Sequence, residues 1–233
     1  MTTVVFVRHG LTAATGERLT GQLPDVHLDE RGQAQAAALA KRFAGVNLAA
    51  VVTSPLERCR ETAEPIADQA GLDLHVDDRL IECGYGEWTG RTLRDIAKDP
   101  LWKVVQSHPS AAVFPGVDGE SLRAVQHRAV DAVRAWNASL GPQAVWVCCS
   151  HADVIRLVLA DALGMHLDEF QRLVVDPCSV SIVRYTTLRP FVLRINDSDL
   201  DFAQLLSPPK PRRKRSPRSA AASPSDRSQP HTP

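Results

Sequence analysis

Short runs of apolar, β-branched residues alternate with longer segments of helical periodicity along most of the 233-residue chain. Such runs are typical of strands buried on both faces of a sheet, and apolar residues at i, i+3 and i+4 are typical of amphipathic helices. The expected strands cover residues 4–7, 48–52, 72–76 and 144–149, with a terminal hairpin at 180–185 and 191–195. The expected helices cover residues 30–44, 55–70, 120–140 and 151–163. This alternation predicts an α/β domain whose mostly parallel sheet has helices on both faces.

Residues at the segment boundaries support these elements. Asp29 precedes the first expected helix and Gly45 follows it, as capping residues do. Ser54 and Pro55 are expected as the N-cap and first residue of the second helix. Residues 79–118 are rich in Gly, Trp and Pro, which predicts an irregular excursion with short helices.

Composition divides the chain into two parts. Residues 1–206 are expected to form one domain, since their length suffices for one well-buried core. Residues 207–233 consist largely of Pro, Ser, Arg and Lys, with seven basic residues and one acidic, and are predicted to be a disordered basic tail. The rest of the chain is acidic, which argues against nucleic-acid binding outside the tail. The tail is either a nucleic-acid or anionic-surface contact, or simply solvated.

Cysteine content and hydropathy bear on location. The five cysteines form no C-x-x-C pair and no Cys/His cluster at zinc spacing, which favours reduced thiols. No secretory signal and no stretch of 18 apolar residues is visible, so we expect no membrane segment and a cytoplasmic location.

Charged and polar residues follow the expected strands where ligands bind in parallel sheets. Arg8 and His9 follow the first strand, Arg58 lies in the helical turn after the second, and His151 follows the fourth. Glu82 lies just beyond the third strand, where partial burial would raise a carboxyl pKa toward that of a general acid. Cations around a histidine suit a transferring phosphoryl group. Each signal alone is weak, and a surface or packing role remains the alternative for each.

The order and spacing of several motifs are more specific than any one of them. Over residues 1–195 the chain resembles the histidine phosphatase superfamily, in its phosphoglycerate-mutase-like branch. The resemblance rests on Arg8-His9-Gly10, Gly21 with Asp25 and Leu28 ahead of Gly32-Gln33-Ala34, Ser54-Pro55-Leu56 with Arg58, Thr62-Ala63, Glu82 with Gly86, Trp88 and Gly90, Gly119-Glu120-Ser121, and Ser150-His151.

The resemblance implies a three-layer α/β/α sandwich and a set of roles. His9 would be the nucleophile, Arg8, Arg58 and His151 would bind the phosphoryl oxygens, and Glu82 would protonate the leaving oxygen. No metal and no cofactor is implied. Further substrate contacts are expected from the loop after the first strand and from the start of the helix at 151–163, namely from Thr15, Thr20, Gly21 and Ala152. Thr15 replaces an asparagine that is frequent in the family, and residues 115–121 depart from the usual Pro-Gly-Gly-Glu-Ser stretch.

Three functions fit this pattern. The leading hypothesis is a phosphomonoesterase for small phosphorylated metabolites, because residues 84–90 look like those of phosphatase members. The alternatives are a cofactor-dependent phosphoglycerate mutase and a non-catalytic, phosphate-binding regulatory protein. The natural substrate and a homodimeric state are left open by the sequence.

Overall fold

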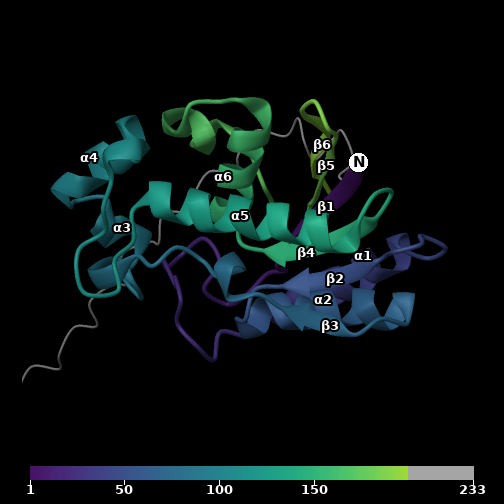
Figure 1. Ribbon diagram of the computed structural model, residues 1–233. Coiled ribbons are helices and arrows are strands. Elements are labelled where there is room, and N and C mark those ends of the chain that lie inside the picture. Colours follow the sequence, from purple (N-terminus) through teal and green to yellow (C-terminus); the bar gives the residue numbers. More distant parts are fainter. Residues whose placement is uncertain (199–233) are drawn as a thin grey trace, which may run out of the picture. The chain divides into compact units, whose positions relative to one another are not determined.

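A six-stranded sheet forms the centre of the computed structural model, which describes residues 1–198 (Figure 1). Its strands are β1 (Thr2–Arg8), β2 (Ala50–Thr53), β3 (Leu74–Val76), β4 (Val145–Ser150), β5 (Val180–Tyr185) and β6 (Pro190–Asp197), in the order β3-β2-β4-β1-β5-β6. The first four strands in that order are parallel, and β5 and β6 add an antiparallel hairpin next to β1. The prediction of a mostly parallel sheet with a terminal hairpin is confirmed.

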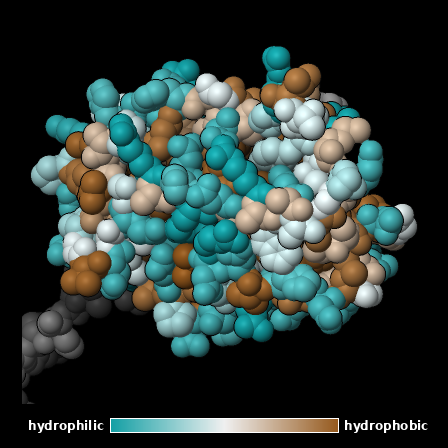
Figure 2. Space-filling view, viewed as in Figure 1, coloured by the Kyte–Doolittle hydropathy of each residue, from teal (hydrophilic) through white to brown (hydrophobic). Residues whose placement is uncertain are grey.

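Helices cover both faces of the sheet, which confirms the three-layer α/β/α sandwich (Figure 1). The main helices are α1 (Glu30–Arg42), α2 (Glu57–Ala70), α5 (Leu122–Leu140) and α6 (Ala152–Leu163). Side chains alternate between the two faces along each strand. In β1, Val5 and Val7 belong to the core under α1 and α2, whereas Val4 and Phe6 belong to the core under α5 and α6. Figure 2 shows hydrophilic side chains over the middle of the viewed face, where α5 lies in Figure 1.

The expected excursion is present and carries two short helices, α3 (Leu93–Ile96) and α4 (Pro100–Ser107), with three-residue 3-10 turns on either side. Aromatic rings hold it together. The rings of Tyr85 and Trp88 each meet Phe114 edge-on, at centroid distances of 5.0 and 5.4 Å. We call residues 86–121 the cap, because they cover the cavity described below.

Several boundaries differ by a few residues from those expected. Asp29 caps α1 as predicted, accepting a hydrogen bond from the Gly32 amide at 2.8 Å. Ser54 was expected to cap a helix starting at Pro55, but α2 starts at Glu57, and its N-cap Leu56 has no side chain able to accept a hydrogen bond. The hydroxyl of Ser54 lies 2.8 Å from His151 instead. The third strand starts at Leu74 rather than residue 72, a difference common at element ends.

Three further sequence predictions concern the cysteines, membrane segments and the tail. All five cysteines lie within the described residues and are buried as free thiols. Among helices in residues 1–198, none combines the length and apolar character needed to cross a bilayer. The predicted end of the domain at 206 and the basic tail at 207–233 lie outside the described residues.

Candidate active site

The carboxyl ends of β1, β2 and β4 bring residues from distant parts of the chain together. These strands are parallel neighbours, so their carboxyl ends lie side by side. His9 follows β1 and its amide donates to the carbonyl of Ser150 at the end of β4. His151 follows that serine, and the ring centroids of the two histidines are 5.3 Å apart. The predicted meeting of His9 and His151 is thus found.

His9 is held as a neutral ring with one free nitrogen. Its side chain is buried, and Nδ1 lies 2.8 Å from the carbonyl oxygen of Gly10. A carbonyl oxygen only accepts, so Nδ1 carries the hydrogen and Nε2 keeps its lone pair. Burial, followed by the charges of Arg58 and Arg8, lowers the pKa of His9 to about 3. His9 is therefore uncharged at any pH well above that value, as a nitrogen nucleophile must be.

Arg8 and Arg58 flank His9 with donors that lack partners. Arg58 is buried and gives one bond, from Nη2 to the carbonyl of Gly21 at 2.7 Å. Arg8 gives one, from Nη1 to the carbonyl of Val175 at 2.7 Å. Nε of both residues and Nη1 of Arg58 are buried with no hydrogen-bond partner. Leaving charged donors buried and unpaired is costly, which indicates an anion as their partner.

His151 lies behind His9 rather than on the cavity wall. It is fully buried, with Nε2 2.8 Å from the Ser54 hydroxyl and Nδ1 4.0 Å from a Glu82 oxygen. Burial, with the charge of Arg58 adding to it, holds the pKa of His151 well below its usual range. The ring is therefore neutral, and Ser54 fixes its orientation.

Glu82 has the protonation expected of a general acid. Its side chain is buried, and one oxygen accepts from the Cys83 amide at 2.9 Å. Burial, followed by the negative charge of Asp153, raises the pKa of Glu82 to about 7. The carboxyl thus keeps its proton in mildly acidic solution.

A clamp that sequence reasoning missed holds the backbone around Glu82. Arg128 of α5 donates to the carbonyls of Arg79 and Ile81, both at 2.7 Å, and to that of Glu82 at 3.0 Å. It also pairs with Glu120, whose other role is to accept from the Gly84 amide at 2.7 Å. The Gly119-Glu120-Ser121 motif pointed to Glu120, but nothing in the sequence connected it to Arg128.

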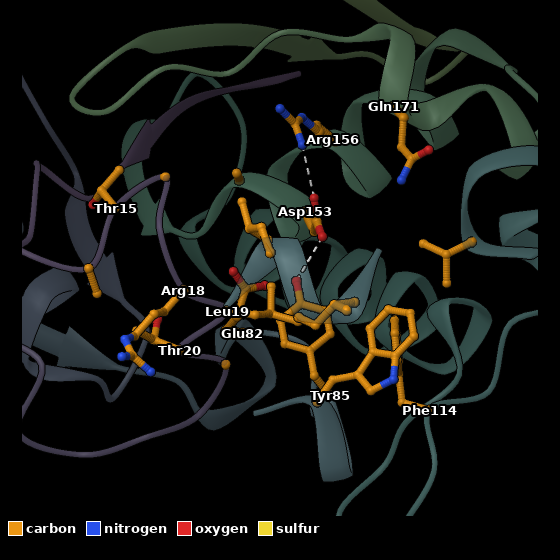
Figure 3. A pocket seen from close by; sticks show the side chains of 18 of the residues that line it. Thr15, Arg18, Leu19, Thr20, Glu82, Tyr85, Phe114, Asp153, Arg156 and Gln171 are labelled. Atoms are coloured by element: carbon orange, nitrogen blue, oxygen red, sulfur yellow. Dashed lines mark hydrogen bonds and ion pairs between the residues drawn. The ribbon is translucent and has the colours of Figure 1, made fainter. Parts of the chain in front are cut away.

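A cavity of about 330 Å³ opens over His9 between the sheet edge and the cap (Figure 3). The predicted site residues on its wall are Arg8, His9, Thr15, Thr20, Gly21, Arg58, Glu82 and Ala152. His151 is absent from that wall, as its position behind His9 explains. The hydroxyl of Thr15 bonds to Thr12, 2.9 Å from that residue's hydroxyl, so it serves the loop in this structure.

A second group on the wall also escaped sequence reasoning. Asp153 accepts from the hydroxyl of Tyr85 at 2.7 Å and from Arg156 at 3.0 Å, as Figure 3 shows. It faces Glu82 from the first turn of α6. Its sequence signal was its place two residues after His151. Within residues 1–198, no three His, Cys, Asp or Glu side chains gather in a way that could hold a metal ion.

Comparison with known proteins agrees with this fold and site. The sequence profile of the histidine phosphatase superfamily, branch 1, matches residues 4–198. A phosphoserine phosphatase 1 of Hydrogenobacter thermophilus is 29% identical, covering 84% of this chain and 92% of that protein. A probable phosphoglycerate mutase of Cronobacter sakazakii is 31% identical, with 79% and 86% covered. The solved structure of a mycobacterial glucosyl-3-phosphoglycerate phosphatase has a TM-score of 0.74 at 27% identity, covering 84% of this chain and 98% of that one.

The fold of this chain is therefore that of a solved phosphatase. The chain belongs to the histidine phosphatase superfamily, and it is a phosphatase-type enzyme of that family.

Proposed function

We propose that the protein is a metal-independent phosphomonoesterase that hydrolyses small phosphorylated compounds through a phosphohistidine on His9. The observation that carries the proposal is the neutral, buried His9 between Arg8 and Arg58, whose buried donors lack partners. A phosphoryl group placed there would satisfy those donors and present its phosphorus to Nε2.

The reaction takes two balanced steps. In the first, Nε2 of His9 forms a bond to phosphorus, the bond to the alcohol oxygen breaks, and Glu82 gives its proton to that oxygen. In the second, a water oxygen bonds to phosphorus, the N–P bond breaks, and the carboxylate of Glu82 takes the proton from water. Two easier displacements replace one difficult one, and inorganic phosphate leaves.

The other residues of the site bind the phosphoryl oxygens. Arg8 and Arg58 supply charged donors, and the Ala152 amide supplies one from the N-terminus of α6. His151 is fully buried beside His9, so it would reach a phosphoryl oxygen only through Nδ1, because Nε2 faces Ser54. Thr15, Thr20 and Gly21 of the first loop line the same cavity and would add further contacts to the phosphoryl group.

The runner-up is a phosphoglycerate mutase, the name carried by one relative. A mutase must bind a second anionic group of phosphoglycerate and keep water from the phosphohistidine. Beyond Arg8 and Arg58, the cavity wall within residues 1–198 carries two cations: Arg156, whose Nη1 is paired with Asp153 while its buried Nε has no partner, and the exposed Arg18, which donates to the carbonyl of Gly90 at 3.1 Å. Asp153 offsets the charge of Arg156, and solvent screens that of Arg18. This arrangement favours hydrolysis.

Location and partners complete the proposal. The substrate is a small phosphorylated molecule. Two phosphatase relatives are named for substrates of this kind. A cytoplasmic location fits five buried free thiols. No macromolecular partner is needed for the chemistry described above.

The first test compares wild type with His9→Ala on p-nitrophenyl phosphate in the presence of a chelator, from pH 4 to 8. We expect wild-type turnover and a loss of about 10³-fold or more in kcat for the variant. Acid-quenched wild type should not retain label from substrate phosphate, whereas base-quenched protein should, since phosphohistidine is acid-labile.

Other results would favour the alternatives. Bisphosphoglycerate-dependent interconversion of phosphoglycerates with little phosphate release would establish the mutase. Phosphate binding without turnover of either substrate would establish the non-catalytic, regulatory protein.

A further inference from the structure

The cavity over His9 continues well beyond the space that a phosphoryl group needs. A volume of about 330 Å³ lies at the lower end of the range for small organic ligands. The end away from His9 is walled mainly by apolar side chains of the cap and of the turn after α6. They include Trp88, Leu93, Ile96, Trp102, Phe114 and Phe170.

Part of this apolar wall belongs to the core, and the wall offers few polar atoms. Trp88, Phe114 and Phe170 are almost fully buried and packed in the core. The indole N–H of Trp88 donates to Asp99 at 3.1 Å, and the Tyr85 hydroxyl donates to Asp153. Both polar ends are thus used within the protein. Leu93 and Trp102 are only partly buried, so they offer accessible apolar surface to a ligand.

The charge of Asp153, which lies near Glu82, disfavours a second anionic group on the substrate. Figure 3 shows Asp153 between Arg156 and Tyr85, with dashed lines to both. Arg156 gives Nη1 to Asp153 and keeps a buried Nε without a partner, so a carboxylate or second phosphate would gain one donor but meet the carboxylate of Asp153. The other polar side chains contributed by the cap and the α6 turn, Gln106 and Gln171, are neutral amides.

From this wall we infer the substrate class: a phosphomonoester of an uncharged, largely apolar alcohol, whose alkyl or aryl part fills the cap end of the cavity. The inference rests on the proposed phosphatase function and narrows it. It also distinguishes this site from one that binds a substrate carrying both a phosphate and a carboxylate. Burying the apolar part holds the ester oxygen near Glu82, so binding energy is converted into orientation for transfer to His9.

The test measures kcat/KM for n-alkyl phosphates from methyl to hexyl, beside affinities of the matching n-alkylphosphonates by calorimetry. Each buried methylene should raise both quantities about fourfold until the cavity is full. An ω-carboxyalkyl phosphate of equal length should be a poorer substrate than the alkyl ester.

Matched variants test whether the cap end of the cavity causes the dependence on chain length. Leu93 lines the cavity with 37% of its surface exposed, so Leu93→Ser should flatten the dependence on chain length without unfolding the protein. Leu188, 84% exposed in the β5–β6 turn, is the control, and Leu188→Ser should leave the dependence unchanged.

The two proposals fail differently. A flat dependence in both measurements, or a preference for the carboxylate ester, overturns the substrate class while phosphatase activity stands. Phosphonate affinity that rises with chain length, without turnover of any ester, upholds the apolar subsite and overturns the phosphatase.

Discussion

At the scale of single residues, the chemistry depends on two opposite pKa shifts. Burial together with Arg58 and Arg8 holds His9 neutral, and burial together with Asp153 keeps Glu82 protonated. An unprotonated His9 and a protonated Glu82 coexist only between the two pKa values. The geometry therefore ties the working pH range to specific neighbours of each group.

The pH profile of kcat/KM is the first prediction at this scale. Glu82 has a raised pKa, so its proton is present below about 7 and lost as pH rises through that value. We expect activity on an alkyl phosphate to be level from pH 4 to 6 and to fall above pH 7. Asp153→Asn removes the neighbouring charge and should move the falling limb to lower pH.

Replacing the acid itself separates proton transfer from binding. Glu82→Gln keeps the size of the side chain and removes the titrating proton, so the falling limb should disappear. Turnover of an alkyl phosphate should drop about 10²–10⁴-fold, the usual contribution of general acid catalysis. Turnover of p-nitrophenyl phosphate should drop much less, because its leaving oxygen needs no proton. Equal losses on both substrates would contradict the role of Glu82 as acid.

At the scale of elements, helix α5 positions Glu82 through Arg128, a residue that does not itself line the cavity. One guanidinium joins three carbonyls of the segment 79–82 and the carboxylate of Glu120. Glu120 in turn fixes the Gly84 amide. The link matters because the segment around Glu82 is irregular between β3 and the cap and has no sheet to hold it.

Arg128→Met tests this positioning role. Several partners lose a charged donor, so we expect about 2 kcal/mol less stability, measured by urea unfolding. At a temperature where the variant is folded, kcat should fall for alkyl phosphates more than for p-nitrophenyl phosphate, since the misplaced group is the acid. Arg134→Met is the matched control, because Arg134 lies on the same helix, exposed, with a 3.7 Å contact to Asp161. If Arg128→Met affects both substrates equally, its role is structural only.

At the scale of the whole molecule, the site is assembled from nearly the full length of the folded domain. Its wall draws on residues from Arg8 to Gln171, and the carboxyl edge of β1, β4 and β2 supplies the floor. The strands β5 and β6 extend the sheet on the far side of β1, and the residues of these two strands do not line the cavity.

Removing residues 207–233 follows from this arrangement. Since the wall residues found among residues 1–198 all precede the tail, a chain ending at Leu206 should keep the kcat/KM of the full chain. Retention on a nucleic-acid column should fall if the basic tail is a contact and stay unchanged if it is merely solvated. Lost turnover would instead show that tail residues support the site.

Much of this architecture is determined by local sequence. Hydrophobic periodicity and strand-end residues predicted the strands, the main helices, and the gathering of Arg8, His9 and Arg58 at one edge, because period and chain direction are properties of neighbouring residues. The resemblance to histidine phosphatases is confirmed over residues 4–198. The roles assigned to these residues remain proposals for the experiments above.

Tertiary structure alone decided how the site is tuned. Ser54 was expected to cap a helix and instead orients His151, 97 residues away. Arg128 holds the Glu82 segment 46 residues before it, and Asp153 joins Tyr85 across 68 positions. Such pairs depend on how helices pack on the sheet, and no local period encodes them. The same holds for the apolar cap over His9: the sequence supplied its aromatic residues, but only packing determined which carbon faces line the cavity and which polar ends are used within the protein.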